Sequence, residues 1–299
     1  MKPVIFFHAS CADGQAAAYA AWTVFKDEAE YVAMKYDNVK TINDVDLLGN
    51  ITERYVYILD FSFPLDVMNH IINVAEHTTW LDHHLTAFRM WCPNVIVGPT
   101  TAYNQSGPKF HIELDNARSG GLIACDYFHL PRTMLFKHID DYDRWQFKLP
   151  GTKEFSKALW ATAPWSFQQW DELNRGTADG GAAYHAMLAT GAALLTEHNN
   201  QVARATDKSR VCMVAGAQGL AVNAPPNLTS DSGHLLAKQS GTYGMVYFID
   251  HNLRAKCSLR STGDYDVSVL AQRYGGGGHK NAAGFECSFD ALEQILNSN

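Results

Sequence analysis

Residues 4–25 read VIFFHASCADGQAAAYAAWTVF, a short β-rich run followed by an alanine-rich segment. The apolar run Val4–Phe7 is typical of a buried parallel strand, and Gln15–Phe25 favours a helix. Two further runs of the strand type follow at Val56–Leu59 and Thr78–Leu81, with a helix predicted between them. This alternation predicts a Rossmann-like α/β domain, in which a parallel sheet carries helices on both faces.

The pattern changes after Trp145. Residues 163–181 contain Pro, Gly and polar clusters, and Ala182–Ala205 is predicted to be one long helix. We therefore expect three parts: a catalytic domain over residues 1–162, a helical connector over 163–205, and a smaller α+β domain over 206–299. The remaining elements that we expect are helices at Pro64–Val74, Ser119–Phe128, Thr133–Ile139 and Val267–Tyr274, and strands at Val211–Val214, Met245–Ile249 and Ala255–Leu259.

Charge and cysteine usage restrict the functional classes. The net charge of −7 lies wholly in residues 1–205, because residues 206–299 hold eight Lys/Arg and eight Asp/Glu. No basic track suits a long duplex nucleic acid, whereas an acidic half suits divalent cations, unless it is simply a solvated surface. The six cysteines are scattered singly, and no signal peptide or membrane segment is predicted, so we expect a cytoplasmic protein.

Metal-competent side chains stand at the ends of three predicted strands. The first strand ends on His8, the second on Asp60, and the third on Asp82-His83-His84. A single such residue is more often a cap or a surface group, but ligands of open parallel sheets bind beyond the carboxyl ends of the strands. Imidazole with carboxylate suits manganese, iron or zinc, and several carboxylates suit two cations sharing one Asp. The sequence therefore predicts a metal-dependent phosphoesterase.

Six segments in order resemble one known family. His8-Ala-Ser-Cys-Ala-Asp13-Gly, Leu-Asp60-Phe, Asp82-His83-His84 and Asp140-Asp141-Tyr-Asp143-Arg-Trp resemble the four motifs of the DHH phosphoesterases. Ser258-Leu-Arg260-Ser and Gly275-Gly-Gly-Gly-His279-Lys-Asn-Ala-Ala-Gly284 resemble the signature of the DHH-associated C-terminal domain. The resemblance covers nearly the whole chain.

The resemblance implies a set of roles. His8 and Asp60 would bind one metal, while Asp13, Asp60, His83 and Asp141 would bind the other, with Mn²⁺ as the expected ion. His84 would face the substrate phosphate, and Asp82 would orient a neighbouring imidazole. Two of these roles have simple structural alternatives: Asp13 as a helix cap, and Asp140 as the ligand in place of its neighbour Asp141. A third carboxylate of the motif, Asp143, is expected to do no more than pair with Arg144.

Cys11 departs from the family, many members of which carry an aspartate there. A thiolate ligand would shift the preference toward zinc or iron, so Cys11 is expected either to bind a metal or to be buried filler.

The glycine run is predicted to be a phosphate-binding loop rather than a Walker loop, because His279 separates the glycines from Lys280 and Asn281 follows. Backbone N–H groups of Gly276, Gly277 and Gly278 would approach a phosphate, with Arg260 and His279 adding charged hydrogen bonds. A plain turn is the alternative.

Three functions compete. The first is hydrolysis of short single-stranded oligonucleotides to mononucleotides, as in the family's nanoRNases and single-strand exonucleases. The second is a phosphatase or phosphodiesterase acting on a dinucleotide, a 3′-phosphorylated nucleotide or polyphosphate. The third is a catalytically silent nucleotide-binding module in which Cys11 marks the lost activity.

Overall fold

The computed structural model describes residues 2–36, 38–162 and 166–297, together with all of their side chains except that of His279. The chain divides into two compact units, Met1–Leu194 and Leu195–Asn299. The division falls inside the long helix α8 (Ala182–Thr206) and not at the ends of a separate connector. Residues 163–165 of the expected connector lie outside the described residues.

The N-terminal unit is built on a six-stranded sheet with the order β2-β1-β3-β4-β6-β5. All neighbouring strands are parallel except the last pair, β5 and β6, which form an antiparallel hairpin. The strands are β1 (Val4–His8), β2 (Glu30–Met34), β3 (Tyr55–Leu59), β4 (His77–Asp82), β5 (Ala102–Gly107) and β6 (Phe110–Asp115).

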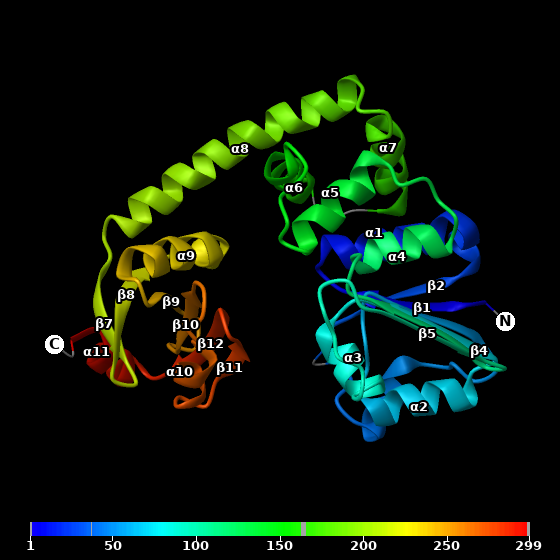
Figure 1. The fold of residues 1–299 in the computed structure, drawn as a ribbon, viewed down its shortest axis with the longest axis horizontal. Coiled ribbons are helices and arrows are strands. Elements are labelled where there is room, and N and C mark those ends of the chain that lie inside the picture. The colour runs from blue at the N-terminus through cyan, green and yellow to red at the C-terminus, as the bar shows by residue number, and fades with distance from the viewer. Residues whose placement is uncertain (1, 37, 163–165, 298–299) are drawn as a thin grey trace. The chain divides into compact units, whose positions relative to one another are not determined.

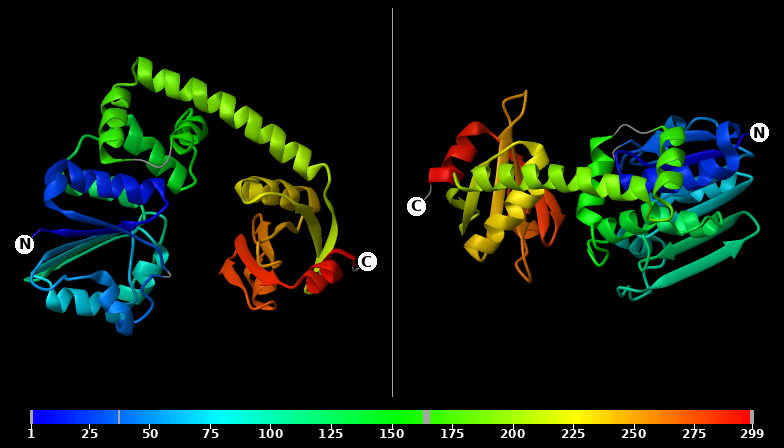
Figure 2. Two further views of the ribbon diagram at one scale, coloured as in Figure 1. Left: turned by 180° about the vertical axis from the view of Figure 1, so that it is seen from behind. Right: turned by 90° about the horizontal axis from the view of Figure 1, so that it is seen from above.

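Helices cover both faces of this sheet, with α1 and α4 on one side and α2 and α3 on the other (Figures 1 and 2). Successive side chains of β1 point to opposite faces of the sheet, each of which has its own hydrophobic core. Ile5 belongs to the core that contains residues of α1 and α4, whereas Phe6 belongs to the core that contains residues of α2 and α3. The helices are α1 (Ala12–Phe25), α2 (Leu65–Val74), α3 (Leu85–Trp91), α4 (Gly120–Tyr127), α5 (Met134–Asp143), α6 (Thr152–Ala161) and α7 (Phe167–Thr177).

Helix α7 belongs to the N-terminal unit. Trp170 is fully buried in the same core as α1, and Tyr19 of α1 donates its hydroxyl to Asp171 at 3.0 Å. The segment after residue 165 therefore contributes to the first core and does not act only as a linker.

The C-terminal unit contains a second six-stranded sheet with the order β11-β12-β10-β9-β8-β7. Only β8 and β9 are parallel, and α9 (Thr229–Ser240) connects them and packs on one face. Helices α10 (Ser268–Gln272) and α11 (Phe289–Asn297) pack with the core of the other face. The strands are β7 (Arg210–Val214), β8 (Ala217–Asn223), β9 (Tyr243–Ile249), β10 (Ala255–Ser261), β11 (Gly277–His279) and β12 (Ala282–Cys287).

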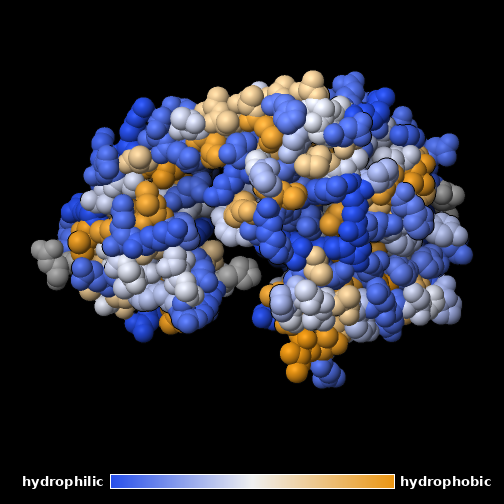
Figure 3. All heavy atoms as spheres, turned by 45° about the horizontal axis from the view of Figure 1, so that its top comes forward, coloured by the Kyte–Doolittle hydropathy of each residue, from blue (hydrophilic) through white to orange (hydrophobic). Residues whose placement is uncertain are grey.

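The predicted fold class is confirmed: a parallel-rich α/β unit is followed by a smaller α+β unit. Short 3₁₀ turns lie at Lys26–Glu28, Ile42–Leu48 and Pro226–Leu228. Hydrophilic residues predominate on the face shown in Figure 3, where the hydrophobic groups are separated from one another. None of the described helices combines the length and the apolar character needed to cross a membrane.

Candidate metal centre

The carboxyl ends of three adjacent strands bring the predicted site together. His8 is the last residue of β1, Asp60 directly follows β3, and Asp82 ends β4 with His83 and His84 after it. Because β1, β3 and β4 are neighbours in a parallel sheet, these side chains share one edge. Asp13 joins them from the first turn of α1.

Asp60 lies between two groups of potential ligands. Its Oδ1 is 3.2 Å from His83 Nε2, and Asp13 Oδ2 is 3.7 Å from the same nitrogen. On the other side, Asp60 Oδ2 is 3.5 Å from His8 Nδ1, and Oδ1 is 3.8 Å from His84 Nδ1. The ligand atoms of Asp13, Asp60 and His83, and likewise those of His8, Asp60 and His84, all lie within 4.8 Å of one another.

Most of these separations are long for hydrogen bonds, and the shortest, 3.2 Å, falls within the range expected for two ligands of one cation. Two ligand atoms about 2.1 Å from one ion, at tetrahedral or octahedral angles, lie roughly 3.0–3.4 Å apart. Asp13 Oδ2, both carboxylate oxygens of Asp60 and His8 Nδ1 are buried, and among the described residues they make no hydrogen bond. Since buried polar atoms are normally satisfied, the donor set fits one or two divalent cations that complete it.

The ionisation of the cluster reflects crowded negative charge. Burial and the neighbouring carboxylates of Asp60 and Asp143 raise the pKa of Asp13 well above its usual range. Burial opposes the charged form of His83, but the Asp60, Asp13 and Asp143 carboxylates prevail and raise its pKa to about 10. A bound cation would replace the proton of His83 as the positive charge that compensates these carboxylates.

Asp82 fixes the orientation of His84. Its Oδ1 lies 2.7 Å from His84 Nδ1 and also accepts the backbone N–H groups of His83 at 2.7 Å and His84 at 3.1 Å. A carboxylate that holds one imidazole nitrogen in this way leaves the other nitrogen available to a metal or a phosphate. His84 thus lies beside His8 and Asp60, and its expected role in facing the substrate phosphate stays a prediction.

Asp13 is held by the N-terminus of α4. Ser119 donates its hydroxyl to Asp13 Oδ1 at 2.6 Å, and the Gly121 N–H donates to the same oxygen at 3.0 Å, so Oδ2 is left for the site. Gly121 allows this approach, because a Cβ there would lie 2.8 Å from Asp13 Oδ1, and a Cβ at Gly120 would likewise lie 2.4 Å from the Cβ of Asp60. Asp60 itself has a left-handed backbone with a φ of 53°, a strained conformation typical of functional sites.

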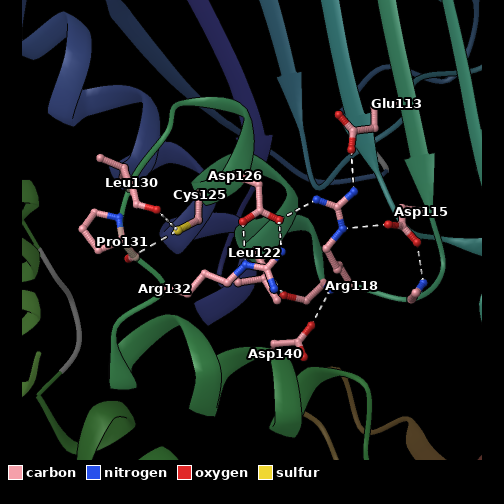
Figure 4. Close-up of polar contacts among 12 residues, drawn as sticks. Glu113, Asp115, Arg118, Leu122, Cys125, Asp126, Leu130, Pro131, Arg132 and Asp140 are labelled. Carbon is pink, nitrogen blue, oxygen red and sulfur yellow. Dashed lines mark hydrogen bonds and ion pairs between the residues drawn. The ribbon is translucent and has the colours of Figure 1, made fainter. Parts of the chain in front are cut away.

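An ion-pair network anchors the turn that carries these donors (Figure 4). Arg118 contacts Asp115 through Nε at 2.7 Å, Asp126 through Nη1 at 2.6 Å, and Glu113 through Nη2. It thereby ties the end of β6 to α4, directly beside Ser119. The sequence predicted the helix but not this support, because the ion pairs form only when β6 and α4 pack together.

The expected assignment of Asp141 as a ligand is corrected by its contacts. The Asp141 carboxylate accepts the backbone N–H groups of Lys148 at 2.8 Å and Leu149 at 3.1 Å, and the Thr152 hydroxyl at 2.6 Å. It holds the loop between α5 and α6. Asp143, at the end of α5, lies instead with Oδ2 3.4 Å from His83 Nε2.

Asp140, the other alternative, has a different role. Its Oδ1 accepts the Ser119 N–H at 2.7 Å, and its Oδ2 lies 3.5 Å from Arg144. The expected pairing of Arg144 with Asp143 is thus replaced by an Asp140 partner. Asp143 is therefore the carboxylate of this motif that the structure adds to the cluster.

Cys11 is in neither group of ligand atoms in the described part of the chain. It precedes α1 and lines a pocket of about 80 Å³ whose wall is mainly apolar. Burial, with the charges of Asp60 and Asp13, raises the pKa of its thiol, so the thiol stays protonated while no cation is bound. Its place outside both groups favours a half-buried packing residue over a ligand. The pocket residues include Asp13, Tyr142, Asp143, Phe155 and Leu159.

The glycine run of the C-terminal unit proves to be partly a strand. Gly277–His279 forms β11 and pairs with β12, so the expected loop is corrected over these residues. A Cβ at Gly276 would lie 2.1 Å from Gly284 O, and one at Gly278 would lie 2.6 Å from Ala282 O. Packing on β12 therefore accounts for two of the glycines, whereas a Cβ at Gly277 would meet nothing within 4 Å.

Arg260, in β10, presents a cation without a charged partner among the described residues. Its guanidinium donates to Leu259 O at 2.9 Å and to Ser230 Oγ at 3.2 Å, both of which are neutral oxygens. Burial lowers its pKa. The expected partner side chain, His279, lies outside the described part of the structure.

Comparison with known proteins agrees with these motifs. Residues 228–298 match the family model of the DHHA1 domain. An uncharacterised protein of Acanthamoeba polyphaga mimivirus is 27% identical over 311 residues, a match that covers 95% of this chain and 67% of that protein.

Solved structures share the fold over 99% of this chain. The pGpG-specific phosphodiesterase PggH from Vibrio cholerae is 13% identical, with a TM-score of 0.54 and 96% of that protein covered. RecJ from Thermus thermophilus, in complex with Mn²⁺, is 12% identical with a TM-score of 0.50 and 51% covered. An exonuclease RecJ bound to manganese is 12% identical, with a TM-score of 0.53 and 89% covered. These findings confirm the resemblance to DHH family phosphoesterases with a DHH-associated C-terminal domain.

Proposed function

We propose that this protein is a metal-dependent phosphodiesterase that hydrolyses short single-stranded oligonucleotides, dinucleotides included, to mononucleotides. The observation that carries the proposal is Asp60, a buried carboxylate that belongs to both ligand groups. Two neighbouring cation sites, here sharing one carboxylate, suit two-metal phosphoryl hydrolysis. Mn²⁺ is the proposed ion, because a hard carboxylate and imidazole set suits it and manganese is bound in the RecJ structures.

The residues of the site have separate roles in the proposed hydrolysis. Divalent cations, when bound, would polarise the phosphoryl group and lower the pKa of a water molecule. Asp13, Asp60, Asp143 and His83 would hold one cation, and His8 and Asp60 the other. His84, kept in place by Asp82, would present its free nitrogen to the cation or to a phosphate oxygen.

The C-terminal unit is proposed to bind the substrate. Arg260, whose described contacts are neutral oxygens, offers an anion site, and Gly277 at the strand edge leaves its backbone open to a ligand. Because residues 206–299 carry no net charge, few phosphates can be neutralised there and a short substrate is expected. We propose residues 1–162 as the catalytic domain and 206–299 as the substrate-binding domain, with 163–205 as a connector whose helix α7 packs in the core of the catalytic domain.

The likeness to PggH, which is specific for pGpG, favours dinucleotides as the shortest substrates. The six free cysteines agree with a cytoplasmic location, which we also propose.

A length series tests the function. Purified protein, stripped with a chelator and reloaded with Mn²⁺, is assayed on single strands of two, three, five, ten and thirty nucleotides. We expect mononucleotide release with kcat/KM highest for two to five nucleotides and a shallow salt dependence. Arg260→Ala should raise KM with the metal content unchanged. Efficient degradation of thirty-nucleotide strands would indicate a long-strand exonuclease, and inactivity on every length with the metal bound would indicate a silent binding module or a different small substrate.

A further inference from the structure

Tyr36 stands beside the metal centre without a role in the chemistry described above. It follows β2, which pairs with β1 in the N-terminal sheet, and so it lies at the same edge as His8. Its ring centroid is 5.3 Å from that of His8 and 6.2 Å from that of His84, both in edge-on arrangements. Tyr36 therefore borders the group of ligands formed by His8, Asp60 and His84.

One face of the Tyr36 ring is covered by another aromatic side chain. Phe61, which is buried, stacks against it with the centroids 4.8 Å apart and the planes at 27°. Phe61 is fixed in turn by Phe63 at 5.0 Å and continues the chain from Asp60. The ring is thus rigidly placed by the same segment that carries the shared carboxylate.

The opposite face of the ring is available to a ligand. Tyr36 is 46% exposed, although Phe61 covers one face and two imidazoles meet its edges. Phe61 and the two imidazoles account for one face and the edges of the ring, and no described ring packs against the other face, which we take to be part of the exposed surface. A supported aromatic ring with an open face is the kind of platform on which nucleobases stack.

We propose that Tyr36 stacks on the nucleobase of the nucleotide whose phosphate lies at the metal centre. The inference rests on the proposed function and adds the recognition of the base to it. Stacking does not depend on base identity, because every base has a π-face, so the contact would select nucleotides over other phosphate esters without selecting a sequence. Burial, with the Asp82 and Asp60 carboxylates, raises the pKa of the Tyr36 phenol, which stays neutral.

The chain supplies a matched control in Tyr55. This tyrosine is 50% exposed, begins β3 at the opposite end of the same sheet, and also lies beside an imidazole, that of His77, at 6.4 Å. Tyr55→Ala therefore removes an equally exposed tyrosine from the same unit, far along the strand from Asp60.

The experiment measures, by calorimetry on the Mn²⁺-loaded protein, the affinities for guanosine 5′-monophosphate and ribose 5-phosphate. Their ratio isolates the base. In Tyr36→Ala we expect the ratio to fall by roughly 5- to 140-fold, which corresponds to about 1–3 kcal/mol of base stacking. Tyr36→Phe and Tyr55→Ala should keep the wild-type ratio, and affinity for ribose 5-phosphate should change less than about twofold in all variants.

The controls decide between the outcomes. Tyr36→Leu keeps the contact with Phe61 filled but lacks a π-face, so it should lower the ratio even if the alanine variant folds poorly. An unchanged ratio in both Tyr36→Ala and Tyr36→Leu, an equal loss in Tyr55→Ala, or an equal loss in Tyr36→Phe would overturn the inference. Hydrolysis of a dinucleotide by the wild type is measured separately. If it is absent the proposed function fails, while the affinity ratio still tests Tyr36.

Discussion

Asp141→Asn and Asp143→Asn each remove one negative charge from the last turn of α5, and the structure predicts opposite consequences for them. The Asp141 carboxylate accepts three hydrogen bonds from the loop that follows α5. An asparagine keeps one acceptor oxygen, but its NH₂ group faces donors that the second carboxylate oxygen accepts in the wild type. Losing about two charge-assisted hydrogen bonds at ~1.5–3 kcal/mol each, with partial rescue by relaxation, destabilises the fold by roughly 2–4 kcal/mol.

Asp143 faces the cluster instead, with His83 3.4 Å away. Burial raises its pKa and Asp60 raises it further, while His83 opposes the shift. Neutralising Asp143 relieves repulsion in the metal-free protein, so the free energy of unfolding should stay the same or rise slightly. A lost ligand should lower the Mn²⁺ affinity by at least tenfold, since even indirect partners of metal ligands are worth ~10–100-fold.

Two measurements separate the variants. Calorimetric melting of the chelator-treated proteins should show Asp141→Asn lowered by roughly 5–15 °C, at about 2–4 °C per kcal/mol for a unit of this size, and Asp143→Asn unchanged. Titration with Mn²⁺ at a temperature where both are folded should show near-normal affinity in Asp141→Asn and weak binding in Asp143→Asn. The reverse pattern, with metal lost only in Asp141→Asn and no change in its melting, would refute the assignment of both residues.

Three further outcomes follow from the site and its support. Asp60→Asn should lower the bound metal to one equivalent or less and reduce turnover by orders of magnitude, because one neutral amide cannot serve two cations; normal activity with two equivalents bound would contradict the shared site. Cys11→Asp should lower the melting temperature of the metal-free protein, because it adds a carboxylate near Asp13, and should change the Mn²⁺ affinity little. A clear gain in Mn²⁺ binding over Zn²⁺ binding would instead show that this position is a metal ligand. Asp126→Asn should cost about 1–2 kcal/mol at pH 7. Pairing with Arg132 and Arg118 lowers the pKa of Asp126 in the folded protein, against the effect of burial. The stability difference between wild type and Asp126→Asn should therefore shrink below the pKa of the unfolded state and vanish as the pH falls through the lowered pKa of the folded state. A stability difference that persists in stronger acid would count against the ion pairs.

The cluster of site residues at the carboxyl ends of the N-terminal strands was predictable, because it depends on short sequence patterns. Apolar runs of strand length end on His8, Asp60 and Asp82, and parallel strands bring their carboxyl ends to one edge whatever their order. The antiparallel hairpin of β5 and β6 was not predicted, since β5 is polar and largely exposed and lacks the apolar signal of a strand. In the C-terminal sheet β7, β9 and β10 were predicted, whereas β8, β11 and β12 are rich in Gly and Ala and lack a run of large apolar residues.

The carboxylate of the last motif could not be chosen from the sequence. Asp141 and Asp143 are two positions apart on a helix, roughly 200° around its axis, so they face opposite sides. Which side meets His83 depends on how α5 packs on α1 and α4, a tertiary property. Tyr36 escaped prediction for a similar reason, because β2 lies next to β1 only through sheet order and no local pattern marks the residue.

The arrangement of donors around the site explains how like charges can be held together before a cation arrives. Asp13 has one oxygen fixed by the neutral donors Ser119 and Gly121, so its second oxygen is oriented without a cationic side chain that would compete with a metal. The cation of the neighbourhood, Arg118, is committed to three other carboxylates and supports the turn from outside. Neighbouring carboxylates raise the pKa values of His83 and His84, so these imidazoles are the positive partners of the cluster, and His83 must lose its proton to become a ligand. Metal binding therefore replaces a proton by a cation of higher charge. The Ser119 hydroxyl and the Gly121 N–H keep the Asp13 carboxylate in place during this replacement.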